Sequence, residues 1–154
     1  MNYRRNLWIK ALTAHKEQVI NNLAEDLAQN WQVNYLTIPQ AGLSLLTLED
    51  GIFQQPYYLG EVPIANAGIE LIDETGQSFT GAAQVMGDSA DFAVALAVCD
   101  AVMAHQLTGW ERVAELIERG MKKRSLEDLQ RGAMLAKTKV NFSLLAQEES
   151  DAED

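Results

Sequence analysis

The segment that most constrains the fold is VMGDSADFAVALAVCDAV at residues 85–102. A polar turn leads directly into a run that is apolar on nearly every side of a helix, and a helix of that kind has to be buried. The pattern predicts one helix over residues 88–106, with Asp88 as its N-cap and Asp91 in its first turn. The alternative is that this turn binds a metal ion or a substrate, although two acids without a nearby histidine are a weak metal pattern.

The residues before this helix alternate with the period of β-strands. Strand-forming residues are enriched in four segments, at 31–38, 41–49, 56–73 and 78–87. Pro39 and Gly42 separate the first two segments, Pro63 marks an edge or a bulge, and DETGQ is the clearest turn. Together they predict a mostly antiparallel sheet of about four or five strands.

Helical periodicity stands on both sides of the strands. Apolar residues recur at three-to-four spacing in the first 31 residues, with a polar TAHKEQ segment that could divide the helix in two. After the apolar helix we expect a helix that Gly120 ends and another that Ser125 begins. The order of N-terminal helices, sheet and C-terminal helices predicts an α+β fold.

Length and composition set the domain organisation. A chain of 154 residues fits one domain, which we place at residues 1–146, and the acidic residues 147–154 are expected to be a disordered tail. No apolar run is long enough to span a membrane, and the N-terminus lacks the apolar core of a signal peptide. The expected location is therefore the cytoplasm.

Charge and cysteine content exclude several classes of site. The net charge of −10 argues against nucleic acid as a partner. A single cysteine excludes an intramolecular disulfide, a cysteine-rich zinc site and an iron–sulfur cluster. Neither of the common glycine-rich phosphate-binding motifs is present, so the chain alone offers no ATP site. The only dense basic run, residues 119–124, is either an anion-binding patch or a solvated connection between helices.

Asp100 is the sharpest single candidate because its neighbours in the predicted helix are apolar. If its carboxylate is buried it needs a partner, which would be an arginine from another element or a group on another subunit. The alternatives are an exposed polar position and a catalytic acid. Cys99 fits a core residue better than a nucleophile, and His15 and His105 stand at helix ends without a metal-binding spacing.

Short motifs follow one another in an informative order. Arg5 and Trp8 form an R-x-x-W pattern, and AGLSLL, YYLGE, VMGDSADFAVALAVCDAV and TKVNF come after it. In this order and spacing, from about residue 5 to residue 145, the chain resembles the G-type subunit of the bacterial carbon–phosphorus lyase core complex. The resemblance gives a structural or interface role, and no catalytic one, to Arg5, Trp8, Gly42, Gly60, Glu61, Gly87, Asp100, Lys139 and Phe142.

The resemblance implies a subunit of a multi-protein machine for phosphonate breakdown. Such a complex first transfers a phosphonate to the ribose of ATP and releases adenine, which yields ribose 1-methylphosphonate 5-triphosphate. The G-type subunit supports this step together with other core subunits, chiefly the I-type subunit. No cofactor is expected on this chain alone, and MgATP is a substrate of the complex. Neither nucleic acid nor a membrane is expected as a partner. Whether the isolated chain self-associates stays open.

The sequence also departs from the family at positions where arginines are common. Thr37 and Gln40 stand where the family often has Arg and Glu, and Ala65 and Asn66 stand where it often has Thr-Arg. Two functions other than support of this step stay open. One is a scaffold or regulator without chemistry, and the other is a stand-alone enzyme that holds a metal ion on Asp88, Asp91 and Asp100.

Overall fold

The computed structural model describes residues 3–138. The chain divides into one unit at Met1–Met121 and a second at Lys122–Asp154. The family-matched positions Lys139 and Phe142, and the predicted acidic tail, lie outside the described residues. The extent of the predicted domain, residues 1–146, therefore stays a prediction.

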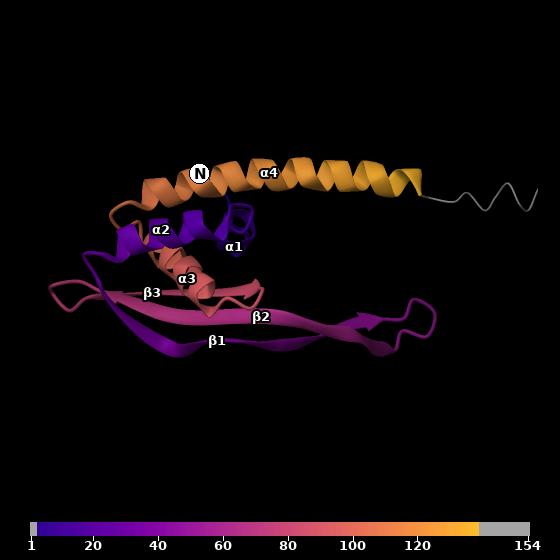
Figure 1. The fold of residues 1–154 in the computed structure, drawn as a ribbon, viewed down its shortest axis with the longest axis horizontal. Helices are drawn as coiled ribbons and strands as arrows, with labels where there is room; N and C mark the ends of the chain where they lie inside the picture. Colours follow the sequence, from indigo (N-terminus) through magenta and orange to yellow (C-terminus); the bar gives the residue numbers. More distant parts are fainter. Residues whose placement is uncertain (1–2, 139–154) are drawn as a thin grey trace, which may run out of the picture. The chain divides into compact units, whose positions relative to one another are not determined.

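One antiparallel sheet organises the first unit. It contains β1 (Gln32–Glu49), β2 (Pro56–Ile72) and β3 (Ser78–Met86), in that spatial order (Figure 1). The α+β class and the antiparallel sheet are confirmed. The expected count of four or five strands is wrong, because residues 3–138 form three strands and two of them are unusually long.

The first two predicted strands are a single strand, β1. Between the pairs Thr37–Gly68 and Gln40–Asn66, β1 has two intervening residues where β2 has one, which is a bulge. Pro39 lies in this bulge on an edge strand, where its missing N–H leaves no ladder hydrogen bond unmade. The proline therefore bends the strand instead of ending it.

Helices flank the sheet in the sequence as expected. The N-terminal segment forms a 3₁₀ turn, η1 (Arg5–Leu7), and then α1 (Trp8–Leu12) and α2 (Glu17–Ala28). The predicted break in the TAHKEQ segment is confirmed, since residues 13–16 separate α1 from α2. After the sheet come α3 (Ala90–Ala104) and α4 (Trp110–Lys137).

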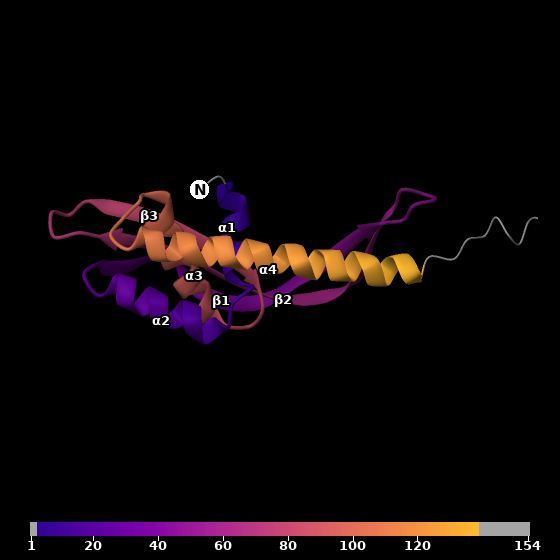
Figure 2. The ribbon, with the colours of Figure 1, turned by 90° about the horizontal axis from the view of Figure 1, so that it is seen from above.

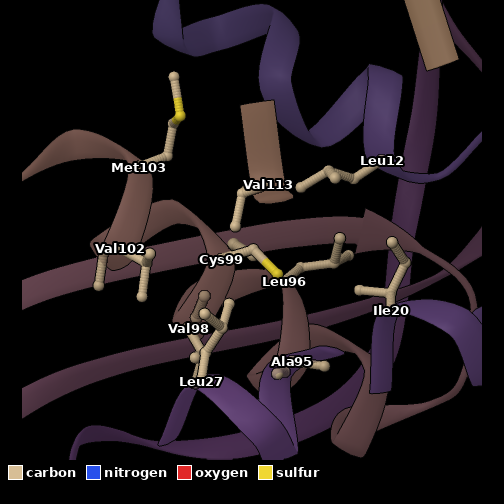
Figure 3. Packing of buried hydrophobic residues seen from close by; sticks show 14 of the residues in the cluster. Leu12, Ile20, Leu27, Ala95, Leu96, Val98, Cys99, Val102, Met103 and Val113 are labelled. Carbon is tan, nitrogen blue, oxygen red and sulfur yellow. The ribbon is translucent and has the colours of Figure 1, made fainter. Parts of the chain in front are cut away.

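The apolar helix α3 is the centre of the core. It packs against β2, β3 and α2, and nearly all of its residues from Ala93 to Met103 are buried (Figure 3). Gly81 of β3 makes this packing close, because a Cβ at that position would lie 2.2 Å from the carbonyl oxygen of Ala97. The prediction that the all-apolar helix is buried is thus confirmed.

The beginning of α3 differs by one residue from the prediction. Ser89 is the N-cap, and its hydroxyl oxygen accepts a hydrogen bond of 3.1 Å from the backbone N–H of Phe92. The same hydroxyl donates to Glu17 of α2 at 2.6 Å. Asp88 is therefore not the cap, whereas Asp91 does lie in the first turn, where a negative charge favours the helix N-terminus.

The predicted pair of C-terminal helices is one helix, α4, which does not end at Gly120. A Cβ at Gly120 would lie 2.1 Å from the carbonyl oxygen of Ala11, so the glycine permits close contact with α1. Ser125 lies inside the helix and is not an N-cap, and the basic run at 119–124 is helical instead of a connection. Within residues 3–138, no helix combines the length and the apolar character needed to cross a membrane.

Candidate functional site

The buried carboxylate of Asp100 is held by Arg5. The Nε of Arg5 donates to Oδ1 at 2.9 Å, and its Nη2 donates to Oδ2 at 2.6 Å, which is a two-point pair. The side chain of Asp100 is only 5% exposed, whereas that of Arg5 is 55% exposed. The sequence predicted that a buried Asp100 would need a partner, either an arginine from another element or a group on another subunit, and the structure supplies an arginine from 95 residues away.

Asp100 also closes the free edge of β3. Its Oδ2 accepts a hydrogen bond of 3.0 Å from the backbone N–H of Ala82. Two residues earlier in the same strand, the carbonyl oxygen of Thr80 accepts from Nε2 of His105 at 3.3 Å. Unpaired backbone groups on an edge strand can pair with other chains, so the side chains of Asp100 in α3 and His105 directly after it protect this edge.

The charges around Asp100 change the protonation of its neighbours. The hydrogen bond to Asp100 raises the pKa of Arg5, against a smaller opposing effect of burial, so the guanidinium stays charged. Burial, with the nearby charge of Asp100 as a smaller cause, raises the pKa of the Cys99 thiol to about 12. A thiol of that kind is not a nucleophile at neutral pH, which confirms Cys99 as a core residue.

This arrangement stabilises the fold and leaves little room for chemistry. The carboxylate of Asp100 accepts three hydrogen bonds and its side chain is only 5% exposed, so it offers little to a ligand from solution. Among the described residues, no group of three or more His, Cys, Asp or Glu side chains could hold a metal ion. Asp88, Asp91 and Asp100 therefore do not form the metal site that a stand-alone enzyme would need.

The other histidine also has a structural partner. Nε2 of His15, between α1 and α2, lies 2.8 Å from the carbonyl oxygen of Leu116 in α4. Since a carbonyl oxygen only accepts, this nitrogen carries the proton. The predicted position of both histidines at helix ends is confirmed.

A shallow hollow on the sheet gathers Thr37 and Asn66, two positions at which the resemblance led us to expect arginine. It measures about 300 Å³, and Thr37, Asn66, Gly68 and Gln84 are among its lining residues. The hydroxyl oxygen of Thr37 accepts a 2.9 Å hydrogen bond from the N–H of Gly68. Residues from three strands thus line a hollow that is mostly apolar and holds no charged side chain.

The second candidate region is a ribbon, which we define as residues 43–63. The last pair between β3 and β2 joins Met86 to Ile64, so beyond it β1 and β2 pair only with each other among the described residues (Figures 1 and 2). Large apolar side chains on both faces of this ribbon are exposed: Leu43, Leu45, Leu46, Leu48, Ile52, Phe53, Tyr57, Tyr58 and Leu59. A two-stranded ribbon is at best marginally stable alone in water.

The remaining family-matched positions do not converge on the Arg5–Asp100 pair. Trp8 packs at the margin of the core, and its Nε1 donates to the carbonyl oxygen of Tyr3 at 3.1 Å. Gly42 lies in β1, and Gly60 and Glu61 lie in the ribbon. Gly87, with a φ of 145°, follows β3, and its N–H donates to the carbonyl oxygen of Pro63 at 2.9 Å.

Two residues that the sequence reasoning did not single out are Ile52 and Phe53. They lie in the loop at the end of the ribbon and are 82% and 74% exposed. The EDG sequence before them predicted the turn, which the structure confirms at Gly51–Phe53. The available signal was the pair of large apolar residues inside a turn, where polar residues are usual.

A comparison with known protein families gives one match. The model of the family described as "Phosphonate metabolism protein PhnG" matches residues 3–147, which is nearly the whole chain. No curated protein matches the chain. The family match covers the sheet, the Arg5–Asp100 pair and the ribbon.

Proposed function

The chain belongs to the phosphonate metabolism protein PhnG family, a subunit of the carbon–phosphorus lyase complex, and from this membership we propose the step that it supports. It assists the transfer of a phosphonate to the ribose of MgATP with release of adenine. The product is ribose 1-methylphosphonate 5-triphosphate. The chain acts in this step by assembly, chiefly with the I-type subunit of the complex, in the cytoplasm and without a cofactor of its own.

The ribbon is the observation that carries this proposal. Its apolar side chains, from Leu43 to Leu59, are exposed on both faces, and isolated water-soluble chains rarely leave such a surface uncovered. A partner that buries the ribbon would stabilise it and gain apolar contact area at the same time. The structure therefore fits a subunit that is completed by a neighbour.

The distribution of charge along the sequence suggests that the partner subunit supplies the groups that bind the anionic substrates. No Lys, Arg or His stands between Lys16 and His105, a span that includes the whole sheet. ATP and phosphonates are anions, and their binding needs cationic side chains, backbone N–H groups or metal ions. We infer that the cations for substrate binding come chiefly from the partner, while this chain positions the partner.

The experiment is a reconstitution of adenine release. Purified I-type subunit would be incubated with MgATP and methylphosphonate, with and without this chain, and free adenine would be measured by chromatography. The proposal expects adenine only when both proteins are present and when titration calorimetry shows that they bind. Binding absent at micromolar concentrations, or adenine released equally without this chain, would contradict it.

The uncharged hollow on the sheet favours a second candidate, a scaffold that no longer takes part in the chemistry. Thr37 and Asn66 both line the hollow, so arginines at these two positions in other family members would converge there. If those arginines contact substrate phosphates, this chain lacks the contact. Exchange of this chain for the G-type subunit of an active complex decides between the candidates, because a scaffold would assemble normally and give no product.

A further inference from the structure

The loop at the end of the ribbon is built around one side chain. We call residues 50–55 the tip. The two carboxylate oxygens of Asp50 accept hydrogen bonds from the backbone N–H groups of Ile52 and Phe53, at 3.3 Å and 3.1 Å. Backbone hydrogen bonds from Asp50 to Gln55 and from Gln54 to Asp50, at 3.0 Å and 2.9 Å, close the loop.

The tip presents two large apolar side chains in a fixed backbone conformation. Ile52 and Phe53 are among the most exposed apolar side chains that the structure describes. Gln54 adopts a φ of 52°, which is uncommon for a residue other than glycine and costs free energy. A loop that holds apolar side chains outward in this way has already lost the conformational entropy that binding would otherwise cost.

The charges beside the tip define the surface that it fits. Glu49 pairs with Pro56 at the end of the strands, directly next to the tip, and Glu61 lies further along the ribbon. Neither carboxylate has a hydrogen bond or ion pair with another described residue, and the ribbon carries no base. A second copy of this chain, with a net charge of −10, fits poorly against such a surface.

We propose that Ile52 and Phe53 are the anchor of the assembly and insert together into an apolar pocket on a different subunit of the complex. Lys or Arg side chains at the rim of that pocket pair with Glu49. Binding energy in protein interfaces concentrates in a few large, central side chains, and rim charges mainly speed association. This inference rests on the proposed function as an assembly subunit, and it adds which residues dock and what chemistry receives them.

The test measures binding of full-length variants by calorimetry. The titrants are the purified I-type subunit and, separately, the other core subunits co-expressed without the G-type subunit. Phe53→Ser is expected to weaken binding at least about 30-fold, as for an interface anchor. The matched control is Ile38→Ala, because Ile38 is as exposed as Ile52, at 82%, but lies in β1 outside the ribbon. It is expected to bind within about twofold of the unchanged chain.

The charge of the rim is tested separately from the anchor. Glu49→Gln is expected to lower the association rate about threefold to tenfold at low salt, with a smaller difference in high salt. Circular dichroism and the unfolding midpoint should be the same for all variants, since every substituted side chain is exposed.

The outcomes separate the inference from the proposed function. If the unchanged chain binds the I-type subunit or the co-expressed subunits, and Phe53→Ser binds equally well, the anchor is refuted while the assembly function stands. The anchor is also refuted if Ile38→Ala weakens binding as much as Phe53→Ser does, or if the unchanged chain is a homodimer that Phe53→Ser converts to a monomer. If the unchanged chain binds neither preparation, both proposals fail.

Discussion

The strand β2 passes through two environments that differ sharply. At residues 64–72 it is the central strand of the sheet under α3, and alternate side chains such as Ala67 and Ile69 are buried. At residues 56–63 its only neighbouring strand among the described residues is β1, and Tyr57 and Tyr58 are exposed. We call residues 64–72 together with β3 the covered sheet, to set it against the ribbon.

The covered sheet and the ribbon differ in how their apolar side chains and strand edges are shielded from water. In the covered sheet, apolar side chains are buried, and Asp100 and His105 form hydrogen bonds with backbone groups on the edge of β3. The ribbon has equally apolar side chains without these protections. Since β2 runs through both regions, the difference lies in what covers the strand and not in how apolar its side chains are.

The largest effect is expected from one methyl group in the covered sheet. In Gly81→Ala the new Cβ would clash with the backbone of α3, at 2.2 Å from the Ala97 oxygen, and should lower the free energy of unfolding by about 4 kcal/mol. At Gly60 in the ribbon a Cβ meets nothing within 4 Å, so Gly60→Ala should change it by less than about 0.5 kcal/mol. Urea unfolding measures the free energy of unfolding of both variants. Similar losses of stability in the two variants would contradict the difference between the covered sheet and the ribbon.

The next effect comes from truncation of one side chain in each region. Ile69 is fully buried, so Ile69→Ala should lower the free energy of unfolding by about 3 kcal/mol through lost burial and a cavity. Leu43 is 69% exposed, and Leu43→Ala should cost less than about 0.5 kcal/mol. Thermal and urea unfolding of the isolated chain provide the measurement. A large cost at Leu43 would show that the ribbon is already packed without a partner.

A smaller effect is expected at the buried carboxylate. Asp100→Ala leaves the N–H of Ala82 without its acceptor, while the half-exposed Arg5 can turn to water. The free energy of unfolding should fall by about 2 kcal/mol, which is the range for the loss of hydrogen bonds to a charged group. Glu61→Ala in the ribbon is the control, with no change expected beyond about 0.5 kcal/mol. Equal values for the two variants would mean that Asp100 has no structural role.

The smallest effect is a dependence of stability on alkaline pH. The pKa of Cys99 rises in the fold from 9.0 to about 12, because burial disfavours the thiolate. The stabilising effect is therefore complete below pH 9 and is lost as the pH rises from 9 towards 12. Between pH 7 and pH 10 the free energy of unfolding should fall by about 1.4 kcal/mol from this group. In Cys99→Ala this part of the pH dependence should vanish, and an unchanged slope would refute the assignment.

The covered sheet was largely predictable from the sequence because burial leaves a pattern. An apolar run at helical length required a buried helix, and alternation over residues 64–72 and 78–86 predicted the strands that it covers. Apolar surroundings likewise predicted that a buried Asp100 would need a partner. Local sequence patterns do not show that this partner is Arg5, because the two residues meet only through the path of the folded chain.

The errors came from residues whose role depends on a distant neighbour. Gly120 suggested a helix end, but it permits contact with Ala11, and Pro39 suggested a strand break, but it lies in a bulge on an edge strand. Whether a glycine ends an element or permits close packing is decided by what lies across from it. The ribbon was missed for a related reason, since apolar alternation looks the same whether a helix of this chain or a partner covers it.

Hydrogen exchange on the ribbon tests the central claim most directly. In the isolated chain, amides at 43–63 should exchange much faster than those at 64–72 and 78–86, because a two-stranded ribbon opens easily. When the chain is bound to the I-type subunit, the ribbon amides should slow at least about tenfold and the covered sheet should change little. Ribbon amides as protected in the isolated chain as those of the covered sheet, or unchanged by the bound partner, would contradict the account.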